Sequence, residues 1–408
     1  MLFDADGREY IDGLAGLWNV VLGHGRHELA DAAREQMASL GFASGYCGSS
    51  NLPAIELAQR LATLTYSGID RFFFTSGGAE ANETAFKVAR SYWKLRGRPG
   101  KIKVISRQLA YHGTTMAAMS ATGIGAYWPL FEPRMPGFVH IPPPYPYRAA
   151  ASTAQSYGRA VADELEAAIL REGADTVAMF IAEPVMGVGG VLVPPDDYFP
   201  RIREICNAHD VLFAADEVIT GFGRTGKWFA LEHWGVAPDM IQFAKAITSG
   251  YFPLGGVGVS GDIARVLDES DSAWMHAYTY SAHPVGCAVA LRTIQFIEEH
   301  DLVAEAARKG AYLLEGLRAR LGTHPHVGEI RGKGLMCAVE FARDAAARSD
   351  FAPEERVGAR IHAEAQARGL FSRIRGDVYL LAPPYVTPDA VLDRMADIVA
   401  DSTKAVLG

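Results

Sequence analysis

Three short segments of this sequence place reactive side chains at or near the ends of apolar runs. Lys245 lies in MIQFAKA, Asp216 and Glu217 lie in VLFAADEV, and Gly77 and Gly78 follow RFFFTS. A lysine within an apolar run is rare unless it is paired or used chemically. Burial favours the neutral amine, which can attack an aldehyde. The alternative is a lysine that extends from an edge strand into solvent.

The carboxylates of Asp216 and Glu217 are costly to bury without a partner. Metal ligation, acid–base chemistry, a salt link to a cationic ligand and a structural pairing all stay open. Gly77 and Gly78 lie between a predicted strand and a predicted helix, where free backbone N–H groups suit a phosphate. A tight turn without a ligand explains them equally well. The segment is neither a GxGxxG motif nor a P-loop.

Taken together, the three segments match the needs of one cofactor, pyridoxal 5′-phosphate (PLP). PLP requires an anion site for its phosphate, a lysine for its aldehyde and a carboxylate that keeps its pyridine nitrogen protonated. The sequence supplies all three on one alternating pattern of strands and helices. We therefore predict that Lys245 holds PLP as a Schiff base.

Apolar runs of strand length alternate with amphipathic helical patterns between residues 71 and 260. This alternation predicts a mostly parallel sheet covered by helices on both faces. Ligands bind beyond the carboxyl ends of such strands, where Tyr111, His112 and Glu183 also collect. Helices are predicted over 28–40, 53–64, 79–96, 198–209, 302–321, 354–367 and 388–405, and a hairpin with an Asp6-Gly7 turn opens the chain.

The length of 408 residues predicts two domains, because one core rarely grows so large. We place residues 1–44, an entry arm, with the small domain, assign 45–285 to a large PLP-binding domain, and assign 286–408 to the rest of a smaller α+β domain. The net charge of −8 argues against a nucleic-acid partner. Four scattered cysteines without zinc spacing predict no metal site, and the absence of a long apolar stretch predicts a cytoplasmic protein.

Seven motifs make the chain resemble the class III (ω-) aminotransferases, PLP-dependent enzymes of fold type I. In chain order they are GLWNVVLGHG, FTSGGAEANET, YHGTT, AEPVMGVGGVLVPP, AADEVITGFGRTG, FAKAITSGYFPLGG and YTYSAHPVGCA. The resemblance covers nearly the whole chain and is strongest to the ω-amine and β-alanine:pyruvate transaminases. It implies an α/β fold with a large domain and a smaller α+β domain. It also implies PLP as cofactor and a homodimer with shared active sites, which could pair into a dimer of dimers.

The resemblance implies a role for each matching residue. Lys245 resembles the Schiff-base lysine that also carries the substrate proton, and Asp216 resembles the partner of the pyridinium nitrogen. Further cofactor contacts are implied for Val218 below the ring, Tyr111 above it with His112 beside it, Gly77, Gly78 and Ala79 at the phosphate, the supporting acid Glu183, and Thr279 at the phosphate of the partner's site.

Two of these positions depart from the family pattern, and one has a second explanation. The family often has serine where this chain has Gly77 and Ala79, so backbone N–H groups are expected to carry more of the phosphate binding. Glu183 is alternatively an acid that nearby backbone groups satisfy. Met186 lies where many members have a glutamine near the ring hydroxyl, so that hydrogen bond is not expected here.

Substrate choice is predicted from three positions. Ornithine and 4-aminobutyrate members carry a glutamate that pairs with their substrate-binding arginine, and this chain has Val188 at that position. The difference argues against the arrangement by which those enzymes accept 2-oxoglutarate. Arg373 resembles the mobile arginine of amine–pyruvate members, which binds a carboxylate and swings away for an uncharged amine. Arg375 is the competing candidate, and either is alternatively a surface arginine. Trp18 with Leu17 resembles the pocket wall of the same enzymes, the alternative being a core tryptophan.

The sequence thus predicts an ω-amine:pyruvate aminotransferase, which transfers an amino group from a primary amine or ω-amino acid to a keto acid by a ping-pong mechanism. The alternatives are a class III aminomutase, a decarboxylating transaminase, or a PLP-binding protein without turnover. Family members usually have a further helix and loop before the opening hairpin. We therefore expect the pocket wall built by that segment to be missing or altered.

Overall fold

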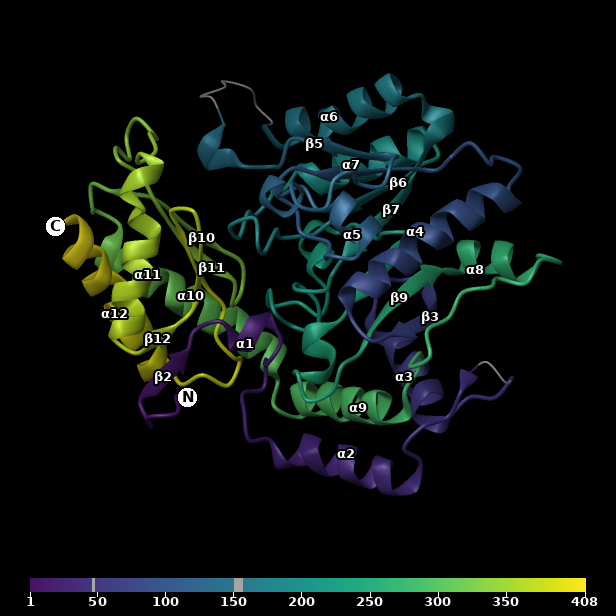
Figure 1. Cartoon of the computed structure of the whole chain (residues 1–408), viewed down its shortest axis with the longest axis horizontal. Helices are drawn as coiled ribbons and strands as arrows, with labels where there is room; N and C mark the ends of the chain where they lie inside the picture. The colour runs from purple at the N-terminus through teal and green to yellow at the C-terminus, as the bar shows by residue number, and fades with distance from the viewer. Residues whose placement is uncertain (46–47, 150–156) are drawn as a thin grey trace.

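The computed structural model describes residues 1–45, 48–149 and 157–408, and Cys47 lies outside these ranges. The described chain forms a larger part built on a seven-stranded sheet and a smaller part built on a four-stranded sheet (Figure 1). Across the described ranges, no helix has both the length and the apolar character needed to cross a membrane.

The larger sheet has the strand order β3-β9-β8-β7-β6-β4-β5. Strand β9 runs antiparallel to both of its neighbours, and every other neighbouring pair is parallel. The predicted mostly parallel sheet is therefore confirmed. The strands are β3 (Ile69–Thr75), β4 (Lys103–Arg107), β5 (Phe138–Ile141), β6 (Val177–Ala182), β7 (Leu212–Asp216), β8 (Met240–Phe243) and β9 (Gly255–Ser260).

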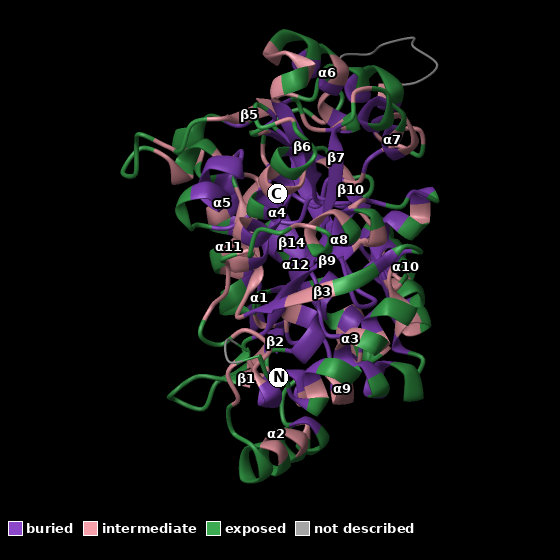
Figure 2. Ribbon diagram, turned by 90° about the vertical axis from the view of Figure 1, so that its right-hand side faces the viewer, coloured by how far each residue is buried: buried purple, intermediate pink, exposed green. Residues whose placement is uncertain are grey.

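Helices cover both faces of this sheet because its central strands are buried throughout and mostly apolar. Every residue of β6, β7 and β8 is buried. Figure 2 shows β6 and β7 buried, with exposed residues on the helices around them. Helix α4 packs Ala85, Phe86 and Ala89 onto one face. The helices of this part are α3 (Leu52–Leu64), α4 (Gly78–Leu95), α5 (Met116–Ala121), α6 (Tyr157–Glu172), α7 (Tyr198–Ala208), α8 (Gly261–Asp268) and α9 (Pro284–Glu299), with short 3₁₀ helices η2 (Gly125–Tyr127), η3 (Pro146–Arg148), η4 (Ala174–Thr176), η5 (Ala230–Trp234) and η6 (Lys245–Thr248).

The smaller part is an antiparallel sheet of order β10-β11-β14-β13 with its own apolar core. Leu317, Val339, Tyr379 and Leu392 join its helices and strands in that core. Its elements are β10 (Val327–Gly332), β11 (Cys337–Phe341), β13 (Arg373–Arg375), β14 (Val378–Leu381), α10 (Leu302–Leu321), η7 (Pro353–Glu355), α11 (Val357–Ala367) and α12 (Asp389–Leu407).

The start of the chain joins this smaller part through β-pairing. Strands β1 (Leu2–Phe3) and β2 (Glu9–Asp12) form the predicted hairpin, with Gly7 at φ +80°, and β12 (Leu370–Phe371) pairs in parallel with β2. The chain then continues through the short helix α1 (Ala15–Trp18) to α2 (His27–Ser39), which lies against α9 (Figure 1). The domain boundaries after residues 44 and 285 stay predictions.

The predicted helices and the predicted strand that contains Lys245 agree with the structure except in two details. The helix predicted over 354–367 is wrong at its start, because Arg356 has φ +49° and separates η7 from α11. Lys245 was predicted within a strand, but β8 ends at Phe243 and Lys245 begins η6. Both errors occur where one residue leaves the regular backbone conformation, which hydrophobic periodicity does not detect.

Candidate active site

Lys245 lies immediately beyond the carboxyl end of β8. Its backbone has φ +50°, a left-handed conformation that costs an L-residue about 1 kcal/mol. The neighbouring residues Ala244 and Ala246 are buried, so packing holds this conformation in place. Burial lowers the pKa of the Lys245 amine, and the carboxylates of Asp216 and Glu183 oppose that shift. A larger neutral fraction of the amine follows.

Two adjoining cavities of about 350 and 200 Å³ meet at Lys245. Gly78 and Val218 are the other residues that line both. The larger cavity is further lined by Leu17, Asn19, Ser76, Gly77, Ala244, Thr248, Gly250, Phe252, Pro253 and Leu254. The smaller one is further lined by Ala79, Asn82, Tyr111, His112, Gly113, Thr114, Glu183, Asp216 and Ile219. Most of the predicted cofactor residues therefore lie together around the smaller cavity.

The Asp216 carboxylate is buried at the end of β7 and is fixed by three donors. Its Oδ2 accepts from Nδ1 of His112 at 2.7 Å and from Nδ2 of Asn82 at 2.9 Å. Its Oδ1 accepts from the backbone N–H of Val218 at 3.1 Å. Because a carboxylate only accepts, Nδ1 of His112 carries a proton. This arrangement leaves acceptor capacity on Oδ1 for a cationic ligand.

Asn82 was not predicted as a site residue. It lies on the sheet-facing side of α4, four residues after Gly78, and also donates to the backbone oxygen of His112 at 2.7 Å. An amide on the otherwise apolar face of an amphipathic helix is the sequence signal that could have identified it.

Glu217 follows Asp216 directly but makes a separate network that does not include the cavity. Its carboxylate accepts from the hydroxyls of Tyr66 and Thr220 and from the backbone N–H of Ala230 at 2.8 Å and of Leu231 at 3.3 Å. Burial raises its pKa to about 7. The structural pairing that was one alternative for these two acids is therefore found for Glu217. Asp216 instead lines the smaller cavity.

The Glu183 carboxylate fixes the chain beside the cavity. It accepts from the backbone N–H of Tyr111 at 3.0 Å and of Gly187 at 2.9 Å. Burial raises its pKa, while the positive charge of a protonated His112 would lower it. Backbone groups therefore satisfy the Glu183 carboxylate, as the alternative explanation proposed. Through one of these bonds Glu183 orients Tyr111.

The glycines of the Gly77-Gly78 turn have different steric surroundings. A Cβ on Gly78 would lie 2.8 Å from Val218 Cγ1, whereas a Cβ on Gly77 would meet nothing within 4 Å. Helix α4 begins at Gly78, and the N–H groups of its first turn lack helical acceptors. Just before this turn, the Ser76 N–H donates to the carboxylate of Glu80 at 2.8 Å. Gly78 is therefore required by close packing and not by its backbone angles.

These residues fit PLP by their chemistry. Nε2 of His112 and Oδ1 of Asn82 are buried beside the smaller cavity and have no partner within the described part of the chain. Unpartnered buried polar atoms are uncommon and point to a missing ligand or water. The cavity also joins an acid, a lysine of lowered pKa, an aromatic ring and a helix N-terminus. This is the donor set that the cofactor needs.

Unlike the cofactor residues, the predicted substrate residues do not all line the two cavities. Leu17 lines the larger cavity, but Trp18 lines neither and is buried in the main core. Asn19 lines the larger cavity and Ile219 the smaller one, and neither was predicted. The signal for Asn19 was its position beside Leu17 in the motif GLWNVVLGHG.

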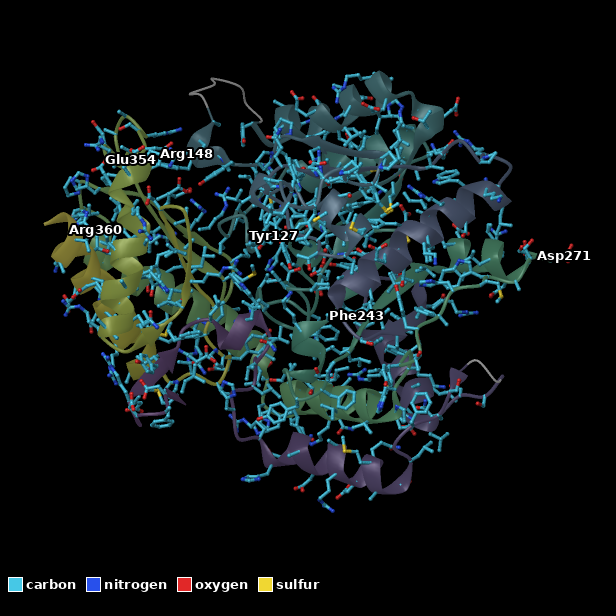
Figure 3. The ribbon with its side chains drawn as sticks, viewed as in Figure 1. Tyr127, Arg148, Phe243, Asp271, Glu354 and Arg360 are labelled. Carbon is cyan, nitrogen blue, oxygen red and sulfur yellow. The ribbon has the colours of Figure 1, made fainter. Side chains whose placement is uncertain are left out.

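Arg373 and Arg375 lie in different surroundings although both belong to β13. Burial raises the pKa of Tyr111, the neighbouring Tyr127 adds to this, and the positive charge of Arg373 opposes it. Arg373 therefore acts on Tyr111 through its charge. The Tyr111 ring centroid lies 5.6 Å from that of Tyr127, which is labelled near the middle of Figure 3. Arg375 instead lines a separate cavity with Tyr145 and other residues.

Three further predicted positions lie outside both cavities. Thr279 is exposed within the segment 274–282. Val188 is buried in the main core, and Met186 packs with Ala110 and Leu192 in a small cluster. Their roles in binding cofactor or substrate stay predictions.

Known proteins with similar sequences and structures form one family. The family model described as Aminotransferase class-III matches residues 1–402. A putrescine–pyruvate aminotransferase from Pseudomonas aeruginosa is 40% identical over 395 residues, which cover 97% of this chain and 86% of that enzyme. A diaminobutyrate–2-oxoglutarate transaminase from Halomonas elongata is 42% identical over 414 residues, covering 99% and 88%. The crystal structure of an (S)-enantioselective ω-transaminase from Thermomicrobium roseum is 50% identical, with a TM-score of 0.97 and coverage of 100% and 91%.

Proposed function

The chain belongs to the class III aminotransferase family and is a PLP-dependent aminotransferase, and we propose that it transfers the amino group of a primary amine or ω-amino acid to pyruvate. The observation that carries this proposal is the position of Lys245 between two cavities. One cavity holds the groups that fit the cofactor, and the other is open to a substrate. A ping-pong reaction, in which amine and keto acid use the same lysine in turn, suits this arrangement.

We assign cofactor binding to the residues around the smaller cavity and to Gly77, which lines the larger one. When bound there, PLP supplies a ring that accepts electrons from the substrate carbon. Asp216 would hold the proton of the ring nitrogen, and His112 and Asn82 fix its carboxylate through Oδ2. The backbone N–H groups of Gly77, Gly78 and Ala79 bind the phosphate at the N-terminus of α4.

Lys245 does the proton chemistry. Because burial lowers the pKa of its Nζ, the neutral amine would take the proton from the substrate carbon that bears the amino group and would deliver it to the bound cofactor. Tyr111 and Val218 confine the reacting groups, since both line the smaller cavity with Lys245. Glu183 orients Tyr111 through its backbone N–H.

The larger cavity supports an amine with an apolar body. Leu17, Phe252, Pro253 and Leu254 contribute apolar side chains, and no carboxylate side chain is among the described residues that line it. A second ammonium group would find no counter-charge there. For the keto acid, Arg373 near Tyr111 offers a guanidinium without a carboxylate partner within the described residues.

Pyruvate is proposed over 2-oxoglutarate because Val188 supplies no carboxylate to pair with the substrate arginine. The relatives differ in acceptor, since the Pseudomonas enzyme is named for pyruvate and the Halomonas enzyme for 2-oxoglutarate. A monoamine, a diamine and an ω-amino acid should each be tested with both keto acids. We expect the highest kcat/KM for the monoamine or the ω-amino acid with pyruvate. A clear preference for 2-oxoglutarate or for the diamine would contradict the substrate assignment, and carbon dioxide release would favour the decarboxylating alternative.

A second copy of the chain is proposed to complete the active site. Large exposed apolar side chains gather near the end of α2, the start of α3 and the segment that contains Thr279, namely Met37, Phe42, Leu52, Ile55, Met275 and Tyr280. Phe42 and Tyr280 are neighbours, with ring centroids 6.1 Å apart. Exposed apolar patches of this kind mark association surfaces. Light scattering of the purified protein should give the mass of a dimer or a tetramer, and a monomer at micromolar concentration would contradict this proposal.

A further inference from the structure

The turn between β2 and α2 has an unusual backbone beside the larger cavity. Ala15, Gly16 and Trp18 all have positive φ angles, of +48°, +65° and +67°. Two of these residues are not glycine, so the turn needs interactions that hold it. The same turn carries Leu17 and Asn19, which line the cavity at Lys245.

One carboxylate supplies several of those interactions, in addition to backbone bonds within the turn such as that from the Trp18 N–H to the Leu14 oxygen at 2.8 Å. Asp12 is 5% exposed, and its Oδ1 accepts from the backbone N–H of Leu14 at 3.2 Å and of Gly16 at 3.0 Å. Its Oδ2 accepts from Gly16 at 2.8 Å and lies 3.3 Å from Nε2 of His24. Aspartate side chains stabilise tight turns by such local bonds to the backbone.

The far end of the same segment is bound to the lysine region. The hydroxyl of Ser249, just after η6, accepts from the Leu22 N–H at 2.9 Å. Tyr251 accepts from the Arg26 N–H at 2.6 Å and donates to the Gly23 oxygen at 3.1 Å. The segment is therefore fixed at its far end by the side chains of Ser249 and Tyr251. Near its start it is fixed by the Asp12 side chain and by backbone bonds of Gly13.

Between these anchors, Leu17 has little support of its own. It is 53% exposed, and its backbone N–H donates to Oδ1 of Asn19 at 2.9 Å. The position of Leu17 against the cavity thus depends on the turn, whose other residues Leu14, Ala15 and Trp18 are buried.

We propose that Asp12 is a positioning residue for substrate size: it holds the turn that presents Leu17 and Asn19 to the cavity at Lys245. The inference rests on the proposed function, because the cavity selects amines only if the protein transaminates them. Loss of the Asp12 carboxylate lets the wall formed by Leu17 move outward. Discrimination between small and bulky amines then falls, while cofactor binding does not change.

Asp12→Ala tests this proposal, and Asp4→Ala is its matched control. Asp4 also accepts from two backbone N–H groups, those of Asp6 and Arg8, but it is exposed in the hairpin away from the cavity. In Asp12→Ala, we expect faster amide hydrogen exchange in peptides that cover Leu14 and Gly16. The ratio of kcat/KM for isopropylamine to that for 1-phenylethylamine should fall about tenfold. The visible spectrum of the bound cofactor should stay that of the wild type.

Two further variants keep the test decisive if Asp12→Ala folds poorly. Asp12→Asn retains an oxygen for the bonds at Oδ1 and should show a smaller change of the same sign. Gly16→Ala keeps Asp12 but adds a Cβ 3.0 Å from Val20 Cγ2 in the left-handed turn, and should show the same loss of discrimination. Wild-type exchange and an unchanged ratio in Asp12→Ala would overturn the proposal. If the wild type transaminates no amine, the proposed function fails, while the exchange measurement still decides whether Asp12 holds the turn.

Discussion

Nδ1 of His112 lies 2.7 Å from Oδ2 of Asp216, and both side chains are fully or nearly fully buried. This bond orients the carboxylate that we assign to the ring nitrogen of PLP. Nε2 of His112, beside the cavity, has no partner among the residues that the structure describes. The pair connects two segments, the YHGTT motif and the end of β7, that are 104 residues apart in sequence.

Replacing Asp216 by asparagine should remove most of the activity. The neutral amide cannot stabilise a protonated ring nitrogen, so we expect kcat to fall by about 10²–10³-fold. Glu217→Gln is the control, because Glu217 bonds to Tyr66 and Thr220 and not to residues of the cavity. Steady-state kinetics of both variants, loaded with cofactor, measure the difference. Equal loss in the two variants would argue against the role of Asp216.

Glu217 should make stability depend on pH. Burial raises its pKa from 4.5 to about 7, so the folded chain binds this proton more tightly than the unfolded chain does. The resulting stabilisation is present at low pH and is lost as the pH rises through about 7. The Tm of the wild type minus that of Glu217→Gln should therefore be larger at about pH 5 than at about pH 8. Scanning calorimetry measures this difference, and a constant value would contradict the raised pKa.

Gly78→Ala should weaken cofactor binding, whereas Gly77→Ala should not. The new Cβ at position 78 would lie 2.8 Å from Val218, while the one at position 77 has free space. Movement of Val218 or of the start of α4 would disturb the phosphate turn, and we expect the Kd for PLP to rise about tenfold. Spectroscopic titration of the apoenzyme compares the two variants. The same affinity in both would show that the close contact with Val218 does not matter.

Arg373→Ala should raise the KM for pyruvate by about tenfold or more, because one carboxylate contact is lost. The KM for an uncharged amine should change little. Arg375→Ala serves as the control on the same strand, since Arg375 lines a separate cavity. If Arg375→Ala changes the KM for pyruvate and Arg373→Ala does not, the assignment of the two arginines is reversed.

Much of the fold could be predicted from the sequence because apolar runs and helical periodicity are strong local signals. The parallel sheet, the opening hairpin and most helix bounds follow from them. The conformation of Lys245 and Arg356 could not be predicted, because a positive φ at a non-glycine residue is imposed by packing of distant segments.

Motif positions identified the residues around Lys245, but they did not identify what supports them. Asn82 was missed because its partner Asp216 is 134 residues away in sequence. Trp18 and Leu17 were predicted at the pocket wall, but of the two only Leu17 lines the larger cavity, where it is joined by Asn19, which was not predicted. Side-chain direction in an irregular turn depends on backbone angles that residue type does not specify.

The central claim is that Lys245 is the lysine that binds PLP covalently. Reduction of the holoenzyme with borohydride, followed by peptide mass spectrometry, tests it directly. Lys101 is the internal rival, because burial also lowers its pKa, to about 8, but its amine donates to the backbone oxygens of Ala174 and His209. We predict the mass of the reduced cofactor on the peptide that contains Lys245 and on no other. Labelling of Lys101 or another lysine, with Lys245 unmodified, would contradict the account.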